Sequence, residues 1–275
     1  KQLIRAAKEA GADAVKFQKR DLKSLYPKQL LDNLKEHEHG FQYAVEFQRR
    51  AEFRYKEYKE IFALCKKLGL ICFATPFDEA SIDFLEKLNQ PLYKVASADL
   101  INIPLLEKII KIKKPLIVST GMSSMEEVDK AVDFLKKRKT DFAILHCNST
   151  YPANIEDLNL SLIPFYKNKF GVTVGYSGHE RDLDTTLTAV SLGASIIERH
   201  ITYDKNAEGP DHPASLEPEE FKDLVQRIRK IEKALGKPEK NLSQGEAINR
   251  QVMGKSLVSN TTRAYDRKTG PNTNI

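Results

Sequence analysis

The stretches VTVGYSGHE (Val172–Glu180) and SIIERHIT (Ser195–Thr202) each hold a short apolar run that ends beside a histidine, His179 in the first and His200 in the second. Short β-branched runs of this kind predict strands. Imidazole is a common metal ligand, so two histidines that follow neighbouring strands predict one shared site. A lone histidine at a strand end is more often simply hydrogen-bonded within the protein, and the matched pair therefore carries the prediction.

Five similar runs precede these two, and amphipathic stretches separate them. The seven runs are Ala12–Gln18, Leu70–Thr75, Leu92–Ser97, Pro115–Thr120, Phe142–Cys147, Val172–Ser177 and Ser195–His200. Their continuous hydrophobicity is typical of parallel strands that are covered on both faces. The helical pattern predicts helices over Gln2–Ala10, Arg54–Leu68, Glu79–Leu88, Leu105–Ile112, Met125–Lys137, Asp182–Leu192 and Pro218–Leu235.

Three junctions between a predicted helix and the next strand have similar sequences, AGADAVKFQ, LGLICFATP and LGASIIERH. A repeated unit of this kind predicts an α/β fold, a (β/α)8 TIM barrel, because almost every strand ends in reactive residues. A doubly wound open sheet is the alternative, with its site at one switch point. The chain opens within a helical pattern, so we expect the barrel's first strand to lie upstream of Lys1.

Domain boundaries follow from the same pattern. Residues 1–240 are expected to form the barrel domain, N-terminally incomplete, and residues 241–275 a linker or tail. The segment Ser24–Arg54 has no clean period and predicts a long loop over the site, and Ser259–Ile275 predicts a disordered polar tail.

Composition narrows the class of protein. The 275 residues carry a net charge of +6, spread over helices that also hold acidic residues, which does not indicate nucleic-acid binding. No apolar stretch is long enough to predict a membrane span. The three cysteines, Cys65, Cys72 and Cys147, lie in apolar runs, and we expect buried, reduced thiols in a cytoplasmic protein.

Polar residues gather where the predicted strands end. They are Lys16 and Gln18, Thr75, Lys94 with Ser97 and Asp99, Ser119 with Thr120, Asn148 with Ser149 and Tyr151, Ser177 with His179, and Glu198 with His200. In a barrel these side chains meet at one face. Lysines within strands are costly to bury without an anion, so Lys16 and Lys94 predict a cradle for phosphate and carboxylate groups.

Two other interpretations of the lysines stay open. Each could pair with a core carboxylate, Asp13, Asp99 or Glu198, or one could form a Schiff base with a carbonyl substrate. The segment EGPDHPAS (Glu208–Ser215) presents Asp211 in a turn, either as a ligand of a substrate hydroxyl or as an ordinary capped turn.

Together the strings VKFQK, FATPFD, YKVASAD, IVSTGMSS, LHCNSTYP, GYSGHE, IERHIT and GPDHPASLEP resemble the sialic acid synthase family, in that family's order, from about Ala10 to Leu235. These enzymes condense phosphoenolpyruvate with an N-acylated hexosamine. The strings GYSGHE and IERHIT look more like the N-acetylneuraminate branch, including its animal members, than the pseudaminate branch. The resemblance also implies a homodimer and a C-terminal antifreeze-like domain that this sequence does not show.

The resemblance implies roles for particular residues. His179 and His200 match ligands of a divalent metal, Mn²⁺ or Mg²⁺, and Lys94 and Asp99 match residues near the reacting carbons. The phosphoenolpyruvate-binding positions are Lys16, Thr75, Lys94, Ser97, Ser119, Ser149 and Ser177, with Asn148 as an alternative to Ser149. The sugar-binding positions are Gln18, Tyr151 and Asp211.

The predicted reaction joins phosphoenolpyruvate to an N-acyl hexosamine, N-acetylmannosamine in the favoured case, to give a sialic acid, N-acetylneuraminate, and phosphate. Alternatives are a sister synthase making legionaminate or pseudaminate, a Schiff-base aldolase, and a barrel fragment without activity.

Overall fold

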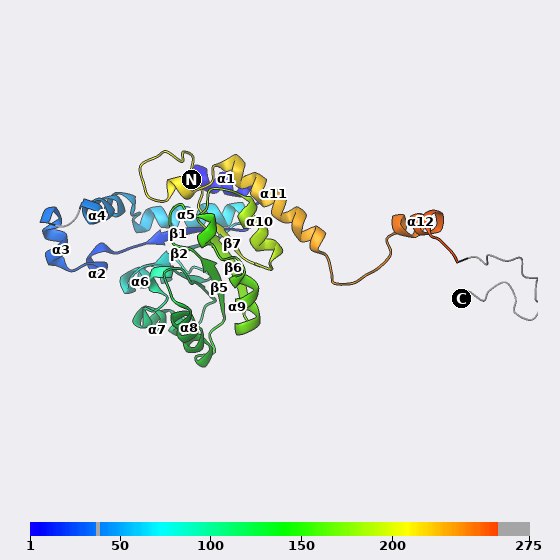
Figure 1. Ribbon diagram of the computed structural model, residues 1–275. Helices are drawn as coiled ribbons and strands as arrows, with labels where there is room; N and C mark the ends of the chain where they lie inside the picture. The colour runs from blue at the N-terminus through cyan, green and yellow to red at the C-terminus, as the bar shows by residue number, and fades with distance from the viewer. Residues whose placement is uncertain (37–38, 258–275) are drawn as a thin grey trace, which may run out of the picture. The chain divides into compact units, whose positions relative to one another are not determined.

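The computed structural model describes residues 1–36 and 39–257, and within them seven parallel strands alternate with helices (Figure 1). The strands are β1 (Ala14–Lys19), β2 (Ile71–Pro76), β3 (Tyr93–Val95), β4 (Leu116–Ser119), β5 (Phe142–Cys147), β6 (Thr173–Gly178) and β7 (Ile197–Arg199). They form two ladders in chain order, β1-β2 and β3-β4-β5-β6-β7. Every predicted run overlaps one strand, so the α/β prediction is confirmed as a parallel half-barrel.

Helices follow most strands and cover the sheet. They are α1 (Gln2–Ala10), α2 (Leu22–Leu25), α3 (Lys28–Asp32), α4 (His39–Ala51), α5 (Tyr55–Leu68), α6 (Glu79–Glu86), α7 (Ile103–Lys111), α8 (Met125–Lys137), α9 (Leu162–Phe170), α10 (Asp184–Ser191), α11 (Pro218–Leu235) and α12 (Gln244–Met253). Consecutive residues of β5, Ile144 and Leu145, are both fully buried, which explains why the strands are continuously apolar. Tyr58 and Leu106 belong to the main core cluster beside these strands.

Local capping chemistry defines several helix ends. Helix α1 ends at Gly11 with φ 88° and α5 at Gly69 with φ 67°, a left-handed conformation that favours glycine. Helix α8 begins with a capping box, because the Ser124 side chain accepts from the backbone of Glu127 and the Glu127 carboxylate accepts from the backbone of Ser124. These caps define the residue at which each of these helices begins or ends, next to a loop that connects it to a strand.

The prediction of a long loop over Ser24–Arg54 is wrong. The described part of this segment holds the short helices α2 and α3 and the longer helix α4. Its periodicity is weak because the helices are short and interrupted near Pro27, and because in α4 Val45 is fully buried while aromatic Tyr43 is exposed. Helix α9 was also not predicted.

Two compact units divide the chain, Lys1–Leu235 and Gly236–Ile275. The described part of the second unit consists of α12 and its flanking residues, and the predicted tail Ser259–Ile275 lies outside the described residues. Among the described helices, none is both long and apolar enough to cross a membrane. The three cysteines are free and buried, as expected.

Candidate active site

A lysine pair and one carboxylate meet where the strands end. The Nζ atom of Lys94 on β3 is 3.8 Å from Glu198 Oε1 on β7, and Lys16 Nζ on β1 is 3.8 Å from the other oxygen. Lys94 also donates to Ser119 Oγ at 2.6 Å, and Ser177 Oγ donates to Glu198 Oε1 at 3.0 Å. Three residues predicted from different strands, Lys16, Lys94 and Ser177, thus contact Glu198, and a fourth, Ser119, contacts Lys94.

Charge is partly balanced in this cluster. Burial raises the pKa of the Glu198 carboxyl, but Lys16 and Lys94 outweigh that effect and hold it at about 2. Burial lowers the pKa of Lys94, against the attraction of Glu198. Two ammonium groups facing one carboxylate leave one net positive charge, which suits an anionic ligand. Asp13 is not their partner, since it pairs with Arg229 at 2.6 Å.

The two histidines converge as predicted. Their ring centroids lie 5.4 Å apart. His179 Nδ1 donates to the Asn148 carbonyl oxygen at 2.7 Å, so Nε2 is the ring nitrogen left to face a ligand. His200 Nδ1 lies 3.7 Å from Asp211 Oδ2. Burial lowers the pKa of His200 to about 4, against the attraction of Asp211, so its imidazole is neutral at pH 7.

Two of the three residues predicted to contact the sugar, Tyr151 and Asp211, lie near the histidines. The ring centroid of Tyr151 is 4.1 Å from that of His179 and 6.1 Å from that of His200. Asp211 also lies beside the histidines, because its carboxylate contacts His200. Gln18 lies on β1 two residues after Lys16, so the two side chains share one face of the strand.

The glycine of the STGMSS turn allows two serines to approach the backbone. Gly121 N donates to Ser97 Oγ at 3.1 Å, and a Cβ atom on Gly121 would lie 2.2 Å from Ser149 Oγ. No other residue fits there without displacing a serine. The Asn148 side chain instead donates to the Asp157 carbonyl oxygen at 3.1 Å. Ser149, not Asn148, therefore faces the turn, beside a cavity of about 350 Å³.

Thr75 lies near the end of β2, and Asp99 lies in the short helical turn after β3. Within the described part of the chain, Thr75 Oγ1 is buried and has no hydrogen-bond partner. Such a hydroxyl is costly to leave unpaired and is available to a ligand. Asn102 Nδ2 donates to Asp99 Oδ1 at 2.9 Å, and burial raises the pKa of the Asp99 carboxyl.

Behind the histidines lies a second charged group that was not predicted from the sequence. Arg199 Nη1 is 2.7 Å from Glu180 Oε1, and both side chains are at most 1% exposed. Tyr176 and Thr186 hydroxyls each donate to Glu180 at 2.7 Å. Because Glu180 follows His179 and Arg199 precedes His200, this pair holds the two strand ends together.

The two imidazoles have donor atoms that suit a divalent metal. A backbone carbonyl fixes the Nδ1–H of His179, and His200 is neutral at pH 7, so each ring fits one ligand position of such an ion. No group of three or more His, Cys, Asp or Glu residues within 1–36 and 39–257 is arranged to hold a metal ion.

The NeuB family model matches residues 3–240 of this chain. The chain belongs to the NeuB family. N-acetylneuraminate-9-phosphate synthase of Mus musculus is 40% identical over 94% of this chain and 73% of its own length. N,N'-diacetyllegionaminic acid synthase of Campylobacter jejuni is 38% identical over 94% of this chain and 79% of its own length.

A solved NeuB-type structure shares the fold. The N-acetylneuraminic acid synthetase of Leptospira borgpetersenii superposes with a TM-score of 0.81 at 34% identity, over 91% of this chain and 84% of that one. The family resemblance drawn from the sequence strings is confirmed, and so is the prediction of a synthase. The sequence placed Glu198 among the polar residues at the strand ends and as a possible lysine partner, but gave it no role in the site.

Proposed function

We propose that this chain condenses phosphoenolpyruvate with an N-acyl hexosamine and releases phosphate. The observation that carries the proposal is the meeting of Lys16 and Lys94 around Glu198, close to the paired imidazoles of His179 and His200. The two lysines can bind the anionic phosphoenolpyruvate, and a metal held by the two histidines would bind the carbonyl group of the sugar.

The sugar belongs to the N-acetylmannosamine type in this proposal. Relatives named for N-acetylneuraminate 9-phosphate, diacetyllegionaminic acid and pseudaminic acid are all similar to the chain, at 40%, 38% and 36% identity. In a nine-carbon product, three carbons come from phosphoenolpyruvate. A phosphate on C9 therefore corresponds to a phosphate on C6 of the hexosamine, so the substrate is either a free sugar or its 6-phosphate.

In this proposal the lysines provide most of the electrostatic stabilisation of the phosphate group. Lys16 and Lys94 neutralise the phosphate of phosphoenolpyruvate, while the hydroxyls of Ser119, Ser177 and Thr75 orient it. The enol carbon attacks the sugar aldehyde, and water adds to the resulting oxocarbenium carbon. Phosphate then leaves with cleavage of its C–O bond, and the lysines stabilise the charge that develops on it.

His179 and His200 would hold a divalent metal, Mn²⁺ or Mg²⁺. When bound, such an ion supplies Lewis-acid polarisation of the sugar aldehyde. Tyr151 and Asp211 flank the imidazoles and would contact the sugar, with Gln18 on the adjacent strand. The buried carboxyl of Asp99 would exchange a proton near the reacting carbons.

We also propose that the seven strands are part of a (β/α)8 barrel, supported by their parallel order and by the convergence of their ends. A Schiff-base aldolase is the second candidate. One observation favours it, since burial lowers the pKa of Lys94 and a Schiff-base lysine must be deprotonated.

A labelling experiment separates the two candidates. Phosphoenolpyruvate carrying oxygen-18 in its bridging position is incubated with N-acetylmannosamine or its 6-phosphate and Mn²⁺. We expect all the label in released phosphate and no lysine trapped by borohydride with pyruvate. Label retained in the product would exclude C–O cleavage, and a trapped Lys94 would establish the aldolase.

A further inference from the structure

Arg20 extends the line of predicted site residues along β1. Lys16 and Gln18 share one face of β1, and Arg20, the residue directly after the strand, continues that alternation. The backbone ladder reaches this point, because Phe77 N donates to Lys19 O at 3.1 Å. At about 3.3 Å per residue, Arg20 lies roughly 13 Å beyond Lys16 along the strand. It is therefore placed at the mouth of the site.

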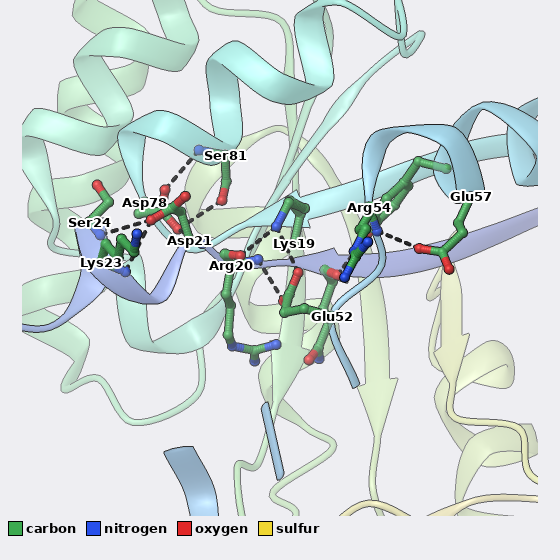
Figure 2. A network of polar contacts seen from close by, with 12 residues as sticks. Lys19, Arg20, Asp21, Lys23, Ser24, Glu52, Arg54, Glu57, Asp78 and Ser81 are labelled. Carbon is green, nitrogen blue, oxygen red and sulfur yellow. Dashed lines mark hydrogen bonds and ion pairs between the residues drawn. The ribbon is translucent and has the colours of Figure 1, made fainter. Parts of the chain in front are cut away.

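The nearby carboxylate of Glu52 is already occupied. Its Oε2 atom lies 2.7 Å from Lys19 Nζ, and its Oε1 atom accepts from the backbone N of Arg20 at 2.8 Å. Figure 2 shows the Arg20 side chain extending away from this pair, with no dashed line at its guanidinium. Among the described residues, no hydrogen bond or ion pair engages that guanidinium.

The guanidinium is nevertheless held in place. Its Cζ atom lies 3.7 Å from the ring centre of Phe77. Stacking on an aromatic face leaves the N–H groups at the edge of the guanidinium free, in the fork geometry that matches an oxyanion. The guanidinium nitrogens are not fully buried, so they stay accessible to an oxyanion that approaches the mouth of the site.

Its surroundings connect it to the predicted sugar site. Burial lowers the pKa of Arg20, and the carboxylates of Glu52 and Asp211 oppose that shift. Arg20 in turn acts on the carboxyl of Asp99. Asp211 follows β7 and Asp99 follows β3. Arg20 therefore interacts electrostatically with predicted site residues that come from two different strand ends.

We propose that Arg20 is a specificity-determining residue that binds a phosphate on C6 of the hexosamine substrate. The inference rests on the proposed function and deepens it. The order of residues along β1 matches the order of groups in the two substrates: Lys16 for phosphoenolpyruvate, Gln18 for the body of the sugar, and Arg20 for its far end.

The test compares two sugars, N-acetylmannosamine and its 6-phosphate, at saturating phosphoenolpyruvate. The variant Arg20→Met removes the charge and keeps an apolar stem on Phe77. We expect kcat/KM for the phosphorylated sugar to fall about 100-fold, mainly through KM, as loss of a charge-assisted bidentate contact predicts. Arg20→Lys should recover about 10-fold of this, because a point charge replaces the fork. The KM for phosphoenolpyruvate should not change.

Lys23→Ala, which removes an exposed charge from the neighbouring helix α2, serves as the matched control and should match the wild type. Calorimetric binding of the phosphorylated sugar provides a readout without turnover, and it should weaken in Arg20→Met but not in Lys23→Ala. Equal losses for both sugars, or a wild type that prefers the unphosphorylated sugar, would overturn the role of Arg20. Absence of phosphate release with both sugars would instead defeat the proposed function, while the calorimetric comparison would still decide the role of Arg20.

Discussion

Glu198 and Glu180 are two carboxylates near the histidines, the first partly and the second fully buried, and they are held in different ways. Glu180 lies 2.7 Å from Arg199 and accepts from two hydroxyls, with its side chain 1% exposed. Glu198 lies 3.8 Å from each of two lysines, with its side chain 18% exposed. The short, fully satisfied pair acts as scaffold, and the longer, more accessible cluster leaves room for an anion to approach the lysines.

The difference arises from strand geometry. Glu198 and Arg199 are consecutive on β7, so their side chains point to opposite faces. One faces the strand ends where Lys16 and Lys94 converge, and the other faces Glu180 at the back of the histidines. Four predictions test this division, from the largest expected effect to the smallest.

Breaking the scaffold pair should have the largest effect on stability. Arg199→Met leaves the Glu180 carboxylate buried and unpaired, and should lower the free energy of unfolding by about 3–5 kcal/mol. Denaturant unfolding followed by circular dichroism measures the change. The double variant Arg199→Met/Glu180→Leu should recover much of the loss, since it removes the orphaned charge. A single variant as stable as the wild type would show that the pair is not scaffold.

Removing an imidazole should act on activity more than on stability. We expect His179→Ala or His200→Ala to lose roughly 100-fold or more of the Mn²⁺-activated rate, as loss of a direct ligand predicts. Mn²⁺ binding, followed by electron paramagnetic resonance, should weaken in parallel. The metal assignment fails if either variant keeps full activity in the presence of a chelator.

Lys94→Met should impair the use of phosphoenolpyruvate. We expect its KM to rise and kcat to fall, with kcat/KM lower by roughly 30-fold or more, because charge neutralisation matters most as phosphate leaves. Lys130→Met is the control, since Lys130 forms an exposed pair with Glu126. Unchanged kinetics in Lys94→Met would return this lysine to a purely structural role.

The smallest effect concerns acid stability. The pKa of Glu198 is lowered from 4.5 to about 2 in the folded chain, so its contribution is present above pH 4.5 and is lost as pH falls toward 2. Glu198→Gln lacks that contribution. The difference in Tm between wild type and variant should therefore shrink between pH 5 and 3. A difference that stays constant with pH would show that the lysines do not depress this pKa.

Much of the fold could be predicted from local signals. Apolar runs located all seven strands, and the helix ends at Gly11, Gly69 and Ser124 use capping chemistry that is local in the sequence. Helix α4 was missed because its buried and exposed residues do not follow hydrophobicity, as fully buried Val45 and exposed Tyr43 show. Local pattern fails where tertiary packing decides which apolar residues are covered.

The amino-acid sequence alone determined the parallel strands and the polar residues at their ends, because both follow from the periodicity of apolar residues. It also determined the family, because the characteristic sequence strings occur in the family's order. Tertiary structure decided which of those residues meet. Glu198 reaches two lysines that precede it by 182 and 104 positions, and Arg199 reaches Glu180 instead. Such pairings depend on strand register and on side-chain direction across the sheet, which a single sequence does not specify.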